Sequence, residues 1–184
     1  MSKRIALLTA AAFGAFALTA SIIAPVSAQE KTVMVGGAAM FPSKNIIQNA
    51  VNSKDHTTLV AAVKAAGLVQ TLEGKGPFTV FAPTNAAFGK LPAGTVDTLV
   101  KPENKATLTK ILTYHVVAGK LEASDLTDGK KLKTAEGEDL TVKKMDGKVW
   151  IVDAKGGTSM VTISNVNQSN GVIHVVDTVL MPAT

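Results

Sequence analysis

The chain has 184 residues, 46% of them apolar and 18% charged, which is the length and composition of about one folded domain. It contains no cysteine, so disulfide scaffolds, thiolate metal sites and cysteine nucleophiles are excluded. Aromatic residues make up only 4%, which argues against rows of aromatic side chains that stack on nucleotides or sugars, and the formal net charge is +5.

Residues 1–28 have the pattern of a cleaved export signal. A short basic start, Lys3-Arg4, precedes an almost unbroken apolar run, and small residues stand before Gln29. A retained membrane anchor is the alternative, because Ile5–Ala24 is long enough to span a bilayer. Pro25 and the small-residue pattern favour cleavage, so we predict a secreted or periplasmic protein with no stable membrane span after signal cleavage.

Cleavage removes two basic residues and leaves 17 lysines against 14 acidic residues, a net charge of +3. No run of basic residues is longer than two, and base-stacking side chains are scarce. A nucleic-acid binder needs a clustered basic face with such side chains. We therefore expect no nucleic-acid partner.

The first half of the mature chain is predicted to be mainly helical. Residues 29–42 show no period and are interpreted as an N-terminal arm, after which Pro42-Ser43 has the character of a helix start. Asp55 is a suitable N-cap for a second helix that Gly67 ends. The buried positions expected for these two helices are Ile46, Ile47, Ala50 and Val51, then Leu59, Val60, Val63 and Ala66.

A short strand and three more helical segments follow. Phe78–Ala82 is mostly apolar and is predicted to be a strand covered on both faces. Thr84 can cap a helical turn, and Leu91-Pro92 is expected to start another short helix. Pro102 is suited to the first turn of a longer helix that runs into residues 114–117.

The last third of the chain changes to strands separated by turn residues. Asp146-Gly147 and Asn170-Gly171 each stand between two strand-like runs, and such pairs are the strongest short signal for a β-hairpin. Helices followed by a meander of antiparallel strands predict an α+β domain.

Few residues offer chemistry. His56, His115 and His174 have no metal-ligand spacing, and no nucleophile, phosphate-binding or zinc motif occurs. His56 is interpreted as a solvated or capping residue and His174 as a core residue. The methionines are dispersed, which favours packing over a copper site. We predict no catalytic residues, no metal, no cofactor and no enzymatic activity.

Three segments together resemble the fasciclin domain family, and the resemblance covers residues 43–183. Thr79–Phe88 (TVFAPTNAAF) resembles its first signature, and Ile111–Val117 (ILTYHVV) resembles its Tyr-His motif. Asn170–Pro182 (NGVIHVVDTVLMP) is similar to its C-terminal signature, in which we expect Gly171 to supply a left-handed turn position. The resemblance implies an α+β fold, a wedge of two small β-sheets with helices packed around it.

The resemblance also implies a function. Family members are extracellular or surface adhesion modules, so we expect an exported, non-enzymatic module of the cell envelope or extracellular matrix that serves cell adhesion, biofilm formation or host association. Its partner would be a cell-surface or matrix protein or polymer, and the module itself a monomer or weakly self-associating. The alternative function is a periplasmic small-ligand or metal-binding protein.

The Tyr-His motif is the candidate binding site. In animal members of the family it is proposed as a binding patch, which here implies a patch of Tyr114 and His115 with four flanking aliphatic residues, Ile111, Leu112, Val116 and Val117. The alternative is that the Tyr and His anchor the core through hydrogen bonds to the backbone.

Overall fold

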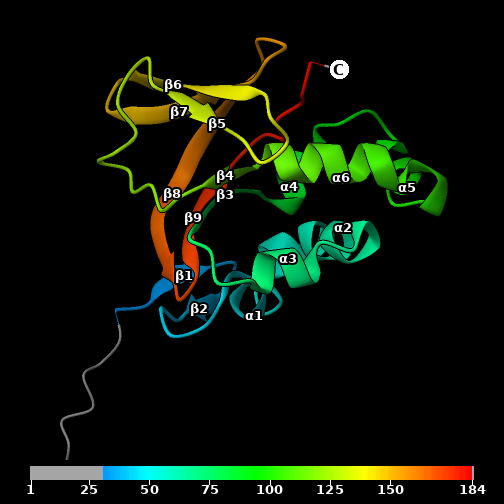
Figure 1. Ribbon diagram of the computed structural model, residues 1–184, viewed down its shortest axis with the longest axis horizontal. Coiled ribbons are helices and arrows are strands. Elements are labelled where there is room, and N and C mark those ends of the chain that lie inside the picture. Colours follow the sequence, from blue (N-terminus) through cyan, green and yellow to red (C-terminus); the bar gives the residue numbers. More distant parts are fainter. Residues whose placement is uncertain (1–30, 184) are drawn as a thin grey trace, which may run out of the picture.

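The structure, a computed structural model, describes residues 31–183, so the predicted export signal lies outside the described residues. A hairpin comes first, helices follow, and most strands lie in the second half (Figure 1). The helices are α1 (Ile46–Ala50), α2 (Thr57–Ala66), α3 (Val69–Glu73), α4 (Asn85–Gly89), α5 (Thr95–Leu99) and α6 (Lys105–Tyr114), with 3-10 turns η1 (Lys54–His56) and η2 (Pro102–Asn104). The strands are β1 (Val33–Val35), β2 (Ala38–Met40), β3 (Phe78–Pro83), β4 (Val116–Ala118), β5 (Lys131–Lys133), β6 (Asp139–Met145), β7 (Lys148–Val152), β8 (Thr158–Gln168) and β9 (Gly171–Val176).

Seven of these strands form one curled sheet in the order β4-β3-β9-β8-β7-β6-β5, beside the two-stranded sheet β1-β2. The prediction of an α+β domain is confirmed. The expected antiparallel meander is confirmed for β5 to β9. The sheet as a whole is mixed, because β3, which precedes the meander in the chain, pairs in parallel with β9. The two edge strands meet where Val117 bridges to Thr134, and the Ala135 amide donates to the Val116 carbonyl at 2.7 Å. The sheet therefore closes partly on itself.

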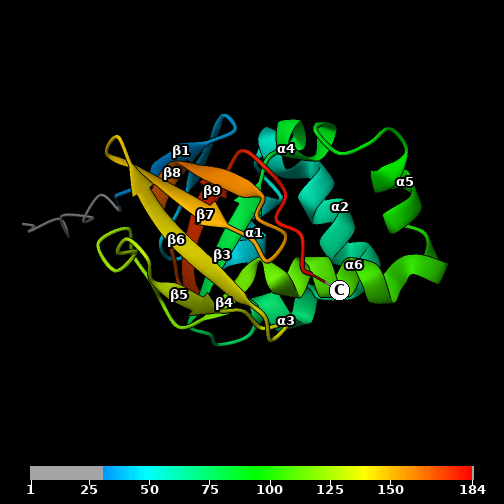
Figure 2. The same ribbon diagram turned by 90° about the horizontal axis from the view of Figure 1, so that it is seen from above.

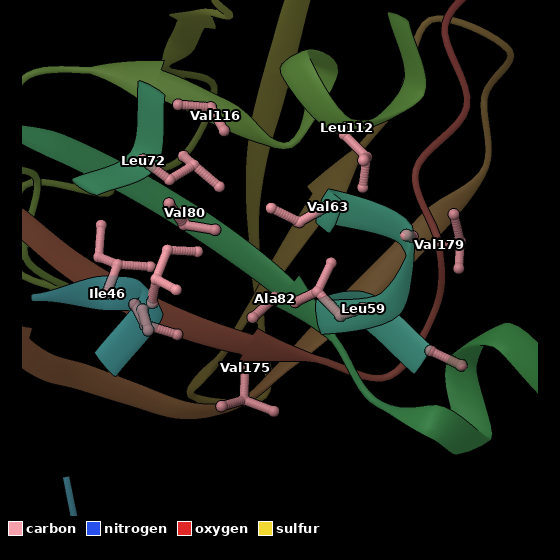
Figure 3. Packing of buried hydrophobic residues seen from close by; sticks show 14 of the residues in the cluster. Ile46, Leu59, Val63, Leu72, Val80, Ala82, Leu112, Val116, Val175 and Val179 are labelled. Carbon is pink, nitrogen blue, oxygen red and sulfur yellow. The ribbon is translucent and has the colours of Figure 1, made fainter. Parts of the chain in front are cut away.

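The curl divides the apolar core into two clusters. The first lies between the helices and strands β3 and β9, where Leu59 and Val63 of α2 face Val80 and Ala82 (Figure 3). The second fills the inside of the curl and includes Phe81. Neighbouring residues of β3 thus enter different clusters, as expected for a pleated strand. The prediction that Phe78–Ala82 is covered on both faces is confirmed for Thr79–Ala82, all of which are buried.

Several local signals give the predicted structure. Gly67 ends α2 in a left-handed conformation with φ of 74°. Thr84 caps α4 by accepting a hydrogen bond from the Ala87 amide at 3.2 Å. Asp146 and Gly147, with φ of 52° and 72°, form the two-residue turn between β6 and β7.

Two helices start later than the sequence predicts. α1 begins at Ile46 rather than at Pro42-Ser43, because the Asn45 side chain accepts from the Gln48 amide and completes a capping box. α5 begins at Thr95 rather than at Leu91-Pro92, after Gly94 in a left-handed conformation.

The predicted N-terminal arm contains a β-hairpin. Gly36 and Gly37, with φ of 56° and 75°, form its turn between β1 and β2. Val35 and Met40 are only 3% exposed and belong to the first core cluster. Each strand has three residues, which is too short for an alternating pattern to be detected in the sequence. The predicted boundary at residue 43 stays a prediction.

The turn between β8 and β9 corrects the expectation for Gly171. Gly171 pairs with Gln168, so the turn consists of Ser169 and Asn170, and Gly171 does not have a positive φ. A Cβ atom at this position would overlap the backbone of Phe78, with which Gly171 pairs across to β3. Glycine is therefore required here by the close approach of two strands and not by a left-handed turn.

Candidate functional site

The six residues of the Tyr-His motif lie where α6 passes into β4. All of them are buried, with exposed fractions of 7% or less. The change from helix to strand sends their side chains into both core clusters: Ile111, Leu112 and Val116 enter the first, and Tyr114 and Val117 enter the second. The structure therefore brings the six residues together but presents none of them as a surface patch.

His115 is held by two backbone groups. Its Nδ1 lies 2.8 Å from the Ile111 carbonyl oxygen, and its Nε2 lies 2.9 Å from the Leu180 amide nitrogen. Because an amide can only donate, Nε2 is the acceptor, and the proton of the neutral ring is assigned to Nδ1, which donates to Ile111. Burial lowers the pKa of His115 to about 4, although the Ile111 carbonyl and the charge of Asp153 act in the opposite direction. The ring is thus neutral at pH 7 and ties α6 to the C-terminal segment.

Tyr114 anchors a second distant segment. Its hydroxyl accepts from the Ala154 amide at 2.8 Å and lies 3.4 Å from the Asp139 carbonyl oxygen, to which it can donate. Burial raises the pKa of Tyr114 to about 12, against the effect of the Ala154 hydrogen bond. Neither Tyr114 nor His115 can exchange a proton with a substrate near pH 7 in this arrangement. The hydrogen bonds have the form of the anchoring alternative, while a direct binding role stays a prediction.

The other two histidines are also buried. His174 is fully buried, as predicted, with its ring stacked on Phe81 at 5.7 Å between centroids and its Nε2 2.7 Å from the Leu121 carbonyl oxygen. The interpretation of His56 as a solvated residue is wrong, since it is 3% exposed and its Nδ1 lies 2.9 Å from the Ser53 hydroxyl. It stands at the N-cap position of α2, but its side chain makes no capping hydrogen bond. Its side chain lines the apolar cavity of the first core cluster together with Leu59 and Val63 of α2. Burial lowers the pKa of both histidines.

Asparagines of the other two signature segments make contacts that the sequence did not reveal. Asn85 accepts from the Thr58 amide at 3.0 Å and donates to the Lys54 carbonyl at 2.8 Å. It therefore caps α2 from another helix, and the prediction of Asp55 as the cap is wrong because the chain enters α2 through η1. The local sign was an amide residue at the start of α4, two positions after the end of β3.

Asn170 ties the turn between β8 and β9 to two helices. Its side chain accepts from the Ile46 amide at 3.1 Å and donates to the carbonyl oxygens of Leu72 and Gly74 at 2.7 and 2.8 Å. It thus satisfies the start of α1 and the end of α3 together. The polar side chains of the signature segments are used to join elements that are far apart in the sequence.

The interior offers little room for a ligand. An apolar cavity of about 40 Å³ lies in the first core cluster, with His56, Val80 and Leu112 in its wall. Sites for small molecules usually measure about 300–1,000 Å³, whereas a cavity of this size holds only water-sized molecules. Within residues 31–183, no group of three or more His, Asp or Glu side chains could hold a metal ion. The same residues include no helix of the length and apolarity that crossing a membrane requires.

The fold defines a class of α+β domain in which a partly closed sheet carries a helical layer and buried polar side chains join its segments. The Fasciclin domain family model matches residues 54–182. The chain therefore belongs to the fasciclin domain family.

Known proteins show the same relationship. The chain is 47% identical over 181 residues to Protein sll1483 of Synechocystis sp., covering 98% of this chain and 97% of that one. It is 40% identical over 138 residues to the immunogenic protein MPB70 of Mycobacterium bovis, covering 72% of this chain and 66% of that one. The cell surface glycolipoprotein MPB83 of the same species is 40% identical over 153 residues, with 80% and 64% covered.

A solved structure supports the fold. A FAS1 domain pair from the insect cell adhesion molecule fasciclin I superposes with a TM-score of 0.68 at 19% identity. The match covers 77% of this chain and 52% of the insect chain, so this chain spans about half of that domain pair.

Proposed function

We propose that the chain is an exported, non-enzymatic adhesion or interaction module of the cell envelope or extracellular matrix. The observation that carries this proposal is the inward use of the signature side chains. Tyr114, His115, His174, Asn85 and Asn170 all bond within the domain, so the signatures build a scaffold and leave recognition to its surface. The family and the printed names of its members, a cell surface glycolipoprotein and a cell adhesion molecule, support an adhesion role.

The partner in this proposal is a cell-surface or matrix protein or polymer, met outside the cytoplasm after export to the periplasm or the medium. The domain acts as a monomer or with weak self-association, and biofilm formation or host association is the process served. A net positive charge favours anionic partners at low salt, since the chain keeps a formal charge of +3 after the predicted signal cleavage.

A strain that lacks the protein tests the proposal. We expect weaker attachment to surfaces and to other cells, restored by the wild-type gene, and saturable binding of the purified protein to intact cells. Unchanged attachment together with no cell binding would contradict the proposal. Native mass spectrometry of protein from its own cells is the second test, because a bound metal or small molecule would favour the small-ligand alternative.

We also propose a test for the Tyr-His motif as a binding patch. Tyr114→Phe removes only the hydroxyl that accepts from Ala154. If the motif binds a partner, this variant loses cell binding at an unchanged melting temperature. If the motif only anchors the core, the melting temperature falls and the folded variant still binds.

A further inference from the structure

We propose that the outer face of strands β5 to β8 binds an anionic polysaccharide, an inference that rests on the adhesion function and names its partner. The strand register defines this face. Trp150 of β7 lies between Lys143 of β6 and Met160 of β8, and Val152 lies between Thr141 and Thr158. The alternate residues of the same strands, such as Val142 and Ile151, are fully buried in the second core cluster. Since side chains alternate along a strand, Trp150 and its neighbours point away from that core.

Among residues 31–183, no helix lies over this face (Figure 2). The helices pack beside β3 and β9, and Figure 2 shows β6 and β7 without a covering element. Trp150 is the single tryptophan of the chain and belongs to neither core cluster. Trp150 is half-buried, so part of its ring is accessible on the open side of the sheet. The accessible part of an aromatic ring offers a flat apolar surface to the C–H face of a sugar ring.

The charges around Trp150 are almost all of one sign. Four exposed lysines share the outer face with one acidic residue, Asp139, which lies opposite Lys133. The lysines are Lys131 and Lys133 of β5, Lys143 of β6 and Lys148 of β7. Within residues 31–183, the ion pairs engage other lysines and leave these four without a carboxylate partner. Lys143 and Lys148 are the neighbours of Trp150, and Lys131 and Lys133 continue the same face two strands away. This arrangement complements an extended polymer whose sugar rings carry carboxylate or sulfate groups.

A membrane surface fits the same face less well. Trp150, Val152 and Met160 are all half-buried, which suits contact with a ligand that lies along the sheet rather than insertion of side chains into a bilayer. The tip of the β6–β7 hairpin exposes Met145, which is 39% exposed, but Asp146 follows it and would face the anionic headgroups. The observations therefore favour a polysaccharide, and anionic vesicles become a control arm of the test.

Trp150 makes the test direct, because its fluorescence reports from this face alone. The purified full chain is titrated with polygalacturonate, with neutral dextran, and with phosphatidylglycerol vesicles at the same charge concentration. We expect a saturable change in emission with polygalacturonate that salt suppresses, and no change with dextran. A response to vesicles but not to polygalacturonate would overturn the proposal, as would no response to either.

A matched pair of variants locates the site. Lys143→Gln with Lys148→Gln removes two charges from the outer face, and Lys64→Gln with Lys105→Gln removes two exposed charges from α2 and α6. Two lost ion pairs should weaken polygalacturonate binding about five- to tenfold in the first variant, with little change in the control. Equal weakening in both would show binding by net charge alone and overturn the site. Cell attachment without polygalacturonate binding would reject this partner and leave the adhesion function standing.

Discussion

Acid should destabilise the domain through its buried histidines, and the effect of His115 can be worked out from its contacts. The native state keeps the ring neutral because Nε2 accepts from the Leu180 amide and burial lowers the pKa to about 4. The unfolded chain takes up the proton near the ordinary value of 6.5. Between these two values the unfolded state binds more protons, so the stability is complete above pH 6.5 and is lost as the pH falls toward 4.

The size of this loss follows from the gap between the two pKa values. A gap of about 2.5 pH units corresponds to a ceiling of about 3.4 kcal/mol, and about 2 kcal/mol of this falls between pH 7 and pH 5. The pKa values of His56 and His174 are also lowered, so protonation of these two residues in the unfolded chain further decreases the stability as the pH falls. The pKa of Asp177 lies below its ordinary value of 3.8, so its protonation does not contribute to the change between pH 7 and pH 5.

Urea unfolding at pH 7 and pH 5, followed by the fluorescence of Trp150, measures the loss. The control is His115→Gln, which offers an acceptor to the Leu180 amide and does not titrate. At pH 7 this variant should be less stable than the wild type, because the Ile111 carbonyl loses its donor. Between pH 7 and pH 5 the free energy of unfolding of the wild type should fall by about 2 kcal/mol more than that of the variant. An equal fall in both proteins would refute the assignment of a neutral, buried His115.

Three further substitutions test the scaffold. Tyr114→Phe leaves the Ala154 amide without its acceptor and should cost about 1–3 kcal/mol in urea unfolding, and a change under about 0.5 kcal/mol would contradict the anchoring role. Asn85→Ala removes the cap of α2 and should cost about 1–2 kcal/mol, whereas the same loss from a control at exposed Asn52 would show that the cap is not the cause. Gly171→Ala places a Cβ against the Phe78 backbone and should prevent stable folding, so a variant with wild-type melting temperature would disprove the close approach.

The sequence predicts what local patterns encode. The period of α2, its end at Gly67 and the Asp146-Gly147 turn each depend on residues close in the chain, and the structure has all three. Such patterns carry no information on the parallel pairing of β3 with β9 or on the closure between β4 and β5. These depend on the packing of strands that are far apart in the sequence.

The candidate site shows the same limit. The Tyr-His motif is found from its residues, but its burial follows from the segments that cover it, the loop at Ala154 and the C-terminal segment at Leu180. Asn85 acts on a helix that precedes it by 27 residues, so a local rule selects Asp55 instead. The outer face needs the register of β6 and β7, since Lys143 and Trp150 become neighbours only across the sheet.

The strands shared by the two core clusters bear on how the domain unfolds. Val80 and Phe81 of β3, and Val175 and Val176 of β9, face opposite clusters from one backbone. If either cluster unfolds, β3 and β9 lose the packing on one of their two faces. Neither cluster is therefore expected to stay folded without the other. The domain should act as a single foldon, with one calorimetric transition and the slowest amide hydrogen exchange in the centres of β3 and β9.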